Sequence, residues 1–144
     1  MSSAEVDLRR AMANLEVIRT QMETLARQEE VLRVTLEEIV RARETLQRAT
    51  QAGVGAEILM PIGANSFVFG SLTSADRVIV GIGSDVALDL RIPAAIERID
   101  ARMKAIEEAE QGLANRMAEL DAAAQERSTE VQELYAKAQG KAPG

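Results

Sequence analysis

Apolar residues recur every three and four positions along two long stretches of the chain, one on each side of a central segment. In the first stretch, two rows repeat every seven residues and lie three residues apart. These rows are Leu8, Leu15, Met22, Glu29, Leu36 and Arg43, and Ala11, Ile18, Leu25, Leu32, Ile39 and Leu46. Such a narrow apolar stripe is typical of a coiled-coil seam. We therefore predict a helix over residues 5–50.

The second stretch repeats the pattern around and after Pro93, a residue that suits the first turn of a helix. Its rows are Ile92, Ile99, Ile106, Leu113, Leu120, Arg127 and Leu134, and Ile96, Met103, Glu110, Met117, Ala124, Val131 and Ala138. We predict a second helix over residues 92–139. The two helices match in length, so an antiparallel pair with Leu46 opposite Ile92 is expected. The alternative is a globular bundle, which would use shorter helices with a wider apolar face.

Between the helices, over residues 57–91, the period changes from seven to two. The pieces EILMPIG, SFVFGSL, RVIVGIG and VALDL are of strand length and rich in Val, Ile and Phe. Gly63, Asn65, Gly83 and Asp85 stand between these pieces, and all four are residue types that tolerate positive φ. The segment therefore predicts two β-hairpins.

Both faces of these strands carry apolar side chains, as in Phe67-Val68-Phe69 and Val78-Ile79-Val80. Exposed strand edges with two apolar faces aggregate unless other chains cover them. We therefore expect the hairpins to be an oligomerisation element that completes a sheet with other subunits. The residues expected in this role are Ile58, Met60, Phe67, Phe69, Val78, Val80 and Ile82.

Composition excludes several classes of function. The net charge of −6 disfavours nucleic-acid binding, which needs a basic face. The chain has no cysteine and no histidine, which removes thiolate metal sites and the commonest general base. No apolar run reaches the roughly 18 residues of a membrane helix, so we expect a soluble protein of a reducing compartment.

No catalytic or cofactor motif is complete. The glycine pairs Gly53–Gly55 and Gly81–Gly83 form neither a GxGxxG motif nor a P-loop with its lysine. Asp85 and Asp89 lack a histidine or a paired acid with hydrolase geometry. We therefore expect no enzymatic activity, no cofactor and no metal site.

The central segment resembles that of the alpha-class subunits of archaeal prefoldin, also called GimC. The resemblance covers nearly the whole chain, but its specific parts are Met60-Pro61-Ile62-Gly63 and Val80-Gly81-Ile82-Gly83. The alpha class is implied by two hairpins where the beta class has one. Asn65 and Asp85 depart from the glycine of this pattern, and both residues can adopt positive φ.

The resemblance implies an ATP-independent chaperone of the cytoplasm, a hexamer of two alpha and four beta subunits. Its hairpins would form a double β-barrel platform, so the fold class is mostly α with a small β part that assembles into this barrel. Antiparallel coiled coils would project from the platform and hold unfolded polypeptides at their ends for delivery to a group II chaperonin. No nucleic acid or membrane takes part.

The client-binding residues are expected where the beginning of the first helix meets the end of the second. They are Val6, Leu8, Met12, Leu15, Val131, Leu134 and Tyr135. Met12 and Tyr135 lie outside the seam rows, which suits a transient contact with a client. Leu8, Leu15 and Leu134 belong to the rows, so they also serve to close the coiled coil.

A structural or tethering protein, oligomerised by its β-insert and without any client, is the alternative function. The last nine residues, AKAQGKAPG, are small and polar, and we predict no ordered element for them.

Overall fold

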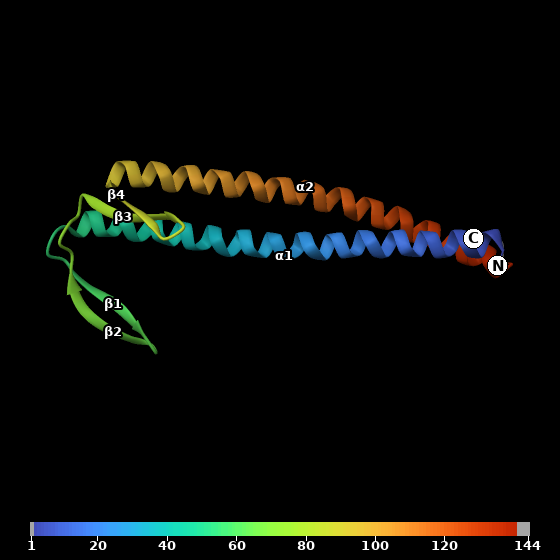
Figure 1. Ribbon diagram of the computed structural model, residues 1–144, viewed down its shortest axis with the longest axis horizontal. Helices are drawn as coiled ribbons and strands as arrows, with labels where there is room; N and C mark the ends of the chain where they lie inside the picture. The colour runs from blue at the N-terminus through green and yellow to red at the C-terminus, as the bar shows by residue number, and fades with distance from the viewer. Residues whose placement is uncertain (1, 141–144) are drawn as a thin grey trace. The chain divides into compact units, whose positions relative to one another are not determined.

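The computed structural model describes residues 2–140 as two long helices joined by two β-hairpins, which confirms the predicted fold class (Figure 1). In chain order the elements are α1 Ser3–Ala52, β1 Glu57–Gly63, β2 Ser66–Ser71, β3 Arg77–Gly83, β4 Val86–Arg91 and α2 Ile92–Ala138. No helix in this part of the chain has an apolar stretch long enough to cross a membrane. α2 extends into the segment expected to lack order, whose last four residues lie outside the described part.

Local signals set the ends of α1. The backbone N–H of Glu5 donates to Ser2 Oγ at 3.2 Å, and the N–H of Ser2 donates to Glu5 Oε2 at 3.1 Å. This reciprocal capping box satisfies two N–H groups that a helix start leaves without partners. At the other end Gly53 has φ 84° and its N–H donates to the carbonyl of Ala49. A glycine with positive φ is the common helix stop.

The burial of the helix side chains follows the predicted rows. Every row position is buried or half-buried except Glu29, which is exposed. The described chain divides into two compact units, the first made of residues up to 33 and from 107 onward, and the second of Val34–Ile106. The buried apolar residues are Ala11, Leu15 and Leu120 in the first unit, and Ile39, Ala95 and Ile106 in the second.

The register of the helices differs from the expected one. In the second unit Arg43 Nε lies 2.7 Å from Asp100 Oδ1, and Arg43 Nη2 lies 3.3 Å from Asp100 Oδ2. Pairing Leu46 with Ile92 would instead place Arg43 opposite Ala95, more than one helical turn away. The predicted antiparallel direction is correct, but the expected pairing, taken from the two row residues that flank the hairpins, does not place Arg43 at the level of Asp100.

The two hairpins share one design. β1 pairs antiparallel with β2, β3 pairs antiparallel with β4, and each pair forms its own two-stranded sheet. The register shifts at the same point in both, between Pro61 and Gly63 and between Gly81 and Gly83. The hairpins are therefore an internal repeat with an irregularity just before each turn.

Positive φ angles confirm the predicted turn residues. Gly63 has φ 99° and Asn65 has φ 57°, and the corresponding Gly83 and Asp85 have φ 102° and 59°. The residues between them, Ala64 and Ser84 in the two turns, also have positive φ, at 50° and 51°. Sequence reasoning missed these two positions because alanine and serine carry no preference for the left-handed region.

Replacing Ala64 by glycine should stabilise the chain. A non-glycine residue in the left-handed region costs roughly 1–2 kcal/mol, and the greater freedom of glycine in the unfolded chain offsets part of that gain. We expect Ala64→Gly to raise the free energy of unfolding by about 0.5–1 kcal/mol, measured by urea titration. Asn65→Gly is the control and should change it less, because asparagine tolerates this region. A destabilised Ala64→Gly variant would contradict the turn geometry.

The Arg43–Asp100 pair should make stability depend on pH. The Arg43 side chain, by its hydrogen bond and its charge, lowers the pKa of Asp100 in the folded chain. The stabilisation is therefore present above the ordinary aspartate pKa of about 4 and is lost as the pH falls through the lowered folded value. Between roughly pH 6 and pH 3, the melting temperature of Asp100→Asn should fall less than that of the parent chain.

Circular dichroism at 222 nm measures both melting curves. The control is Asp7→Asn, because Asp7 makes no ion pair with residues 2–140. Its melting temperature should fall with pH as much as that of the parent chain. If the melting temperatures of Asp100→Asn and the parent chain fall equally with pH, the Arg43–Asp100 pair does not stabilise the chain in solution.

Candidate functional site

The β1–β2 hairpin exposes apolar side chains on both faces. Directly opposite residues of an antiparallel pair point to the same face, so Leu59, Phe69 and Phe67 share one face through the pairs Leu59–Phe69 and Pro61–Phe67. Their exposed fractions are 58%, 76% and 56%. Met60 and Val68 are paired on the opposite face.

The second face of this hairpin is also accessible. Met60 is 43% and Val68 40% exposed. The Met60 side chain lies across Gly70, where a Cβ atom would stand 2.9 Å from Met60 Cε. Glycine at this position therefore lets Met60 spread over the strand. Ile58, on the same face, is half-buried.

Exposure of two apolar faces has a physical consequence. An isolated two-stranded hairpin is marginally stable in water, and patches of this kind mark interaction surfaces or aggregation sites. The other residues of 2–140 cover Leu59, Phe67 and Phe69 only in part. Leu59 and Val68 were not among the predicted assembly residues, although the alternation in EILMPIG and SFVFGSL signals both.

The β3–β4 hairpin has two unlike faces. Val78 is paired with Leu90 and Val80 with Leu88, and all four side chains are half-buried. Ile82 of the predicted assembly set is 44% exposed. On the other face Ile79 is 66% exposed. The expectation of apolar side chains on both faces is therefore confirmed, but here Arg77, Asp89 and Arg91 stand beside the apolar residue.

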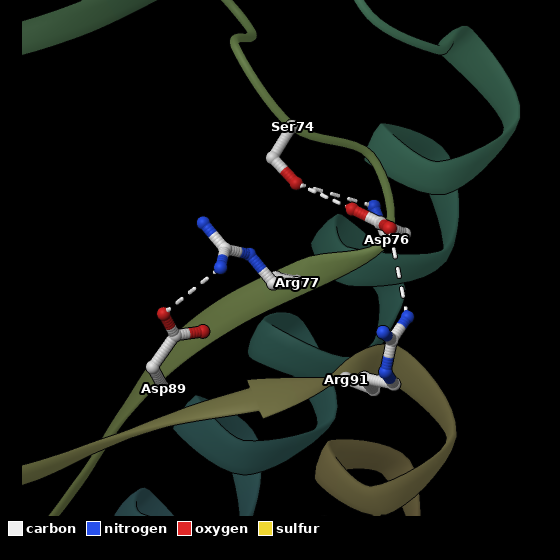
Figure 2. Close-up of polar contacts among 5 residues, drawn as sticks. All are labelled: Ser74, Asp76, Arg77, Asp89 and Arg91. Atoms are coloured by element: carbon white, nitrogen blue, oxygen red, sulfur yellow. Dashed lines mark hydrogen bonds and ion pairs between the residues drawn. The ribbon is translucent and has the colours of Figure 1, made fainter.

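Figure 2 shows the charged residues of this face and the loop before it. Arg77 and Arg91 are paired directly across the strands, which would be unfavourable without counter-charges. Arg77 Nη1 lies 3.5 Å from Asp89 Oδ2, and Arg91 Nη1 lies 3.8 Å from Asp76 Oδ2. All four groups are well exposed, so each pair contributes little stability and chiefly keeps this face polar.

Asp76 is positioned by its own loop. The Ser74 hydroxyl donates to Asp76 Oδ1 at 2.7 Å, and this hydrogen bond is the main cause that lowers the pKa of Asp76 (Figure 2). The carbonyl of Asp76 accepts the backbone N–H of Ile92, the first residue of α2. The loop thus connects the start of β3 to the start of α2.

The predicted client-binding residues all lie in the first unit. Met12, Tyr135 and Val6 are exposed, at 53%, 58% and 40%. Leu15 is buried at 7%, so its side chain takes part in the seam. The remaining three, Leu8, Val131 and Leu134, are half-buried.

The geometry offers exposed apolar binding surfaces. In the described residues, no three Asp or Glu side chains gather where they could hold a metal ion. No buried polar or charged residue occurs there either. Exposed apolar side chains lie on both hairpins and along the helices, and they include Met12 and Tyr135 near the helix ends.

Comparison with known proteins agrees with this arrangement. Residues 18–137 match the family model described as Prefoldin subunit. The chain is 32% identical over 106 residues to the prefoldin subunit alpha of Methanothrix thermoacetophila, which covers 74% of this chain and 69% of that protein. It is 30% identical over 138 residues to the prefoldin subunit alpha of Pyrococcus horikoshii, covering 95% and 93%.

A solved structure shows the same fold. The chain matches a cryo-EM structure of filamentous PFD from Methanocaldococcus jannaschii with a TM-score of 0.70 and 23% identity, over 79% of this chain and 94% of that one. The family model covers most of the chain, including both hairpins, and the relatives extend along both helices. This chain therefore belongs to the prefoldin family of chaperone subunits and resembles its alpha subunits.

Proposed function

We propose that the chain is the alpha subunit of an ATP-independent holdase that captures non-native polypeptides and passes them to a group II chaperonin. The observation that supports this most is the β1–β2 hairpin, which within residues 2–140 carries exposed apolar side chains on both faces. Covering both faces requires other subunits. Family membership supports prefoldin beta subunits as the partners that we propose.

The assembly that follows is a hexamer of two alpha and four beta subunits, with the hairpins forming a double β-barrel platform. Closing a barrel removes free strand edges, which is how proteins avoid aggregation of exposed sheets. The cytoplasm is the proposed location. In this assembly the helical pairs are left to contact clients.

Client binding is proposed at the ends of the helices, in the first unit. Val6, Met12 and Tyr135 present accessible apolar surface there. Burying one Leu-sized side chain contributes roughly 1.5–3 kcal/mol, so one end binds weakly and releases readily. Several ends on one platform would add affinity through effective concentration. This combination suits transient capture without ATP.

Substituting Phe69 by aspartate should prevent assembly. A charge at this position would be buried without a partner once another subunit covers the face, which is strongly unfavourable. Mixed with a prefoldin beta subunit, the parent chain should give the hexamer mass by native mass spectrometry, and Phe69→Asp should not. Val17→Asp, at a side chain 57% exposed on α1, is the control and should assemble. A hexamer formed by Phe69→Asp would contradict the assembly surface.

Substituting Met12 and Tyr135 together by serine should weaken client capture while leaving assembly intact. Loss of both apolar contacts should lower affinity at each end by about tenfold. The measurement is light scattering of urea-unfolded citrate synthase diluted into the complex with the beta subunit. Val40→Ser, in the second unit, is the control and should protect as well as the parent.

Three outcomes would count against the proposal. Full protection by the double variant would show that clients bind elsewhere. A changed native mass would show that assembly and capture are not separate. A parent complex that gives no protection at all would favour the tethering function.

A further inference from the structure

The three asparagines of the chain all lie within residues 2–140, and they differ in backbone conformation. Asn14 lies in α1 and Asn115 in α2, whereas Asn65 lies in the turn between β1 and β2. All three side chains are exposed. Asparagine is a thermolabile residue type, because its side-chain amide can react with the backbone nitrogen of the next residue. Access to water does not distinguish the three positions, so conformation has to.

The two helical asparagines are held away from this reaction. In an α-helix each backbone N–H donates to the carbonyl four residues earlier, so the nitrogen that follows each asparagine is fixed in the helical ladder. The Asn115 side chain is held as well, because its Oδ1 accepts a hydrogen bond from Gln111 Nε2 at 3.0 Å. A stretch of helix has to unfold locally before the attack can take place there.

Asn65 stands in a turn that is weakly tied to the strands. Its φ angle is 57°, outside the helical region. A single pair, Gly63–Ser66, closes the ladder beyond an irregularity at Ile62, which has no partner in the register. Because an isolated two-stranded hairpin is only marginally stable, this last pair can open while the helices stay folded. The turn therefore gives the Asn65 side chain a freedom that the helical asparagines lack.

The residue that follows Asn65 is small. Ser66 carries a hydroxymethyl group, whose Oγ donates to the carbonyl of Ala64 at 3.3 Å. A small side chain leaves the backbone nitrogen accessible, whereas a β-branched side chain crowds the backbone beside it. Val86, a β-branched residue, occupies the corresponding position in the second hairpin. The first turn is therefore the more reactive of the two by sequence as well.

The second hairpin carries the product of such a reaction. Asp85 occupies the position that Asn65 has in the first hairpin, and its φ angle is 59° against 57°. Loss of the Asn65 amide gives aspartate as one product. The first turn would then hold the residue type that its repeat already carries in the same conformation, so this product fits the turn without strain.

We propose that Asn65 is a site of spontaneous deamidation in the folded chain. The backbone nitrogen of Ser66 attacks Asn65 Cγ and forms a new N–C bond, and the side-chain nitrogen leaves as ammonia with the amide proton. Water then opens the cyclic imide at one of its two carbonyl carbons. Breaking the bond to Cγ yields aspartate, and breaking the bond to the backbone carbonyl carbon yields isoaspartate. This chemistry belongs to the chain itself and does not depend on the proposed function.

The two products differ in their effect on the hairpin. Each adds one negative charge to a chain whose net charge is −6. Isoaspartate also adds one carbon atom to the backbone of the turn. Because turn length fixes the register of a hairpin, isoaspartate should disturb the pairing of β1 with β2, whereas aspartate should preserve it.

The test ages the full folded chain at mildly alkaline pH and follows each asparagine by tryptic digestion and mass spectrometry. Trypsin cleaves after Lys and Arg, so peptides 11–19, 49–77 and 105–116 each contain one asparagine. Conversion in peptide 49–77 should be roughly tenfold faster or more than in the other two, because helices open less often than the turn. Heavy-oxygen water labels the opened imide, and an isoaspartyl methyltransferase with labelled S-adenosylmethionine measures the isoaspartate.

One variant tests the role of the following residue. Ser66→Val copies Val86 of the second hairpin, so the turn should still form, and conversion of Asn65 should slow by about tenfold because the branched side chain crowds the nitrogen. The matched control is Ser71→Val, which makes the same substitution at the exposed far end of β2 and should leave the rate unchanged. Equal rates in Ser66→Val and the parent would contradict attack by this nitrogen.

Unfolding in urea separates the effect of the fold from that of local sequence. The helical asparagines should react much faster in urea than in the folded chain, and Asn65 should change far less. If Asn65 reacts in urea but stays intact in the folded chain, the turn protects it and the proposal fails. Equal conversion of all three asparagines in the folded chain would also overturn it. None of these measurements uses a beta subunit or a client, so failure here is distinct from failure of the holdase function.

Discussion

A two-stranded sheet cannot bury two apolar faces by itself, and this constraint governs the rest of the molecule. Phe69 on one face and Met60 on the other are both accessible to water. Helices of this chain could cover one face at most, and their own apolar stripe is already used in pairing with each other. Coverage by other chains is the solution that we propose, and it agrees with the description of the family as subunits.

The helices meet a different requirement with very little core. The described residues contain six buried apolar side chains, and three of these are in each compact unit. A seam only two rows wide leaves most of each helix surface exposed. Alanine, glutamate and arginine suit that surface because they favour helix without needing burial. Apolar residues outside the seam, such as Met12 and Tyr135, are then available to contact other molecules.

The two hairpins show how a repeated element acquires two roles. They share strand length, register irregularity and turn conformation. On the face where the first hairpin carries Leu59 and Phe69, the second hairpin carries Asp89 and the exposed Ile79, with Arg77 beside them. Pro61 of the first hairpin corresponds to Gly81 of the second, so only the second hairpin keeps a backbone N–H at this position.

The sequence by itself determined the features that depend on local physics. Heptad rows predicted which helix side chains are buried, and residues tolerant of positive φ predicted the turns at Asn65 and Asp85. The sequence did not determine the register of the helices, because a seam of similar apolar residues offers several alignments that bury nearly equal apolar area. The Arg43–Asp100 pair distinguishes them only once both helices are placed. Likewise, tertiary structure alone brought parts of α1, β3 and α2 together around one groove, since sequence distance hides which surfaces converge.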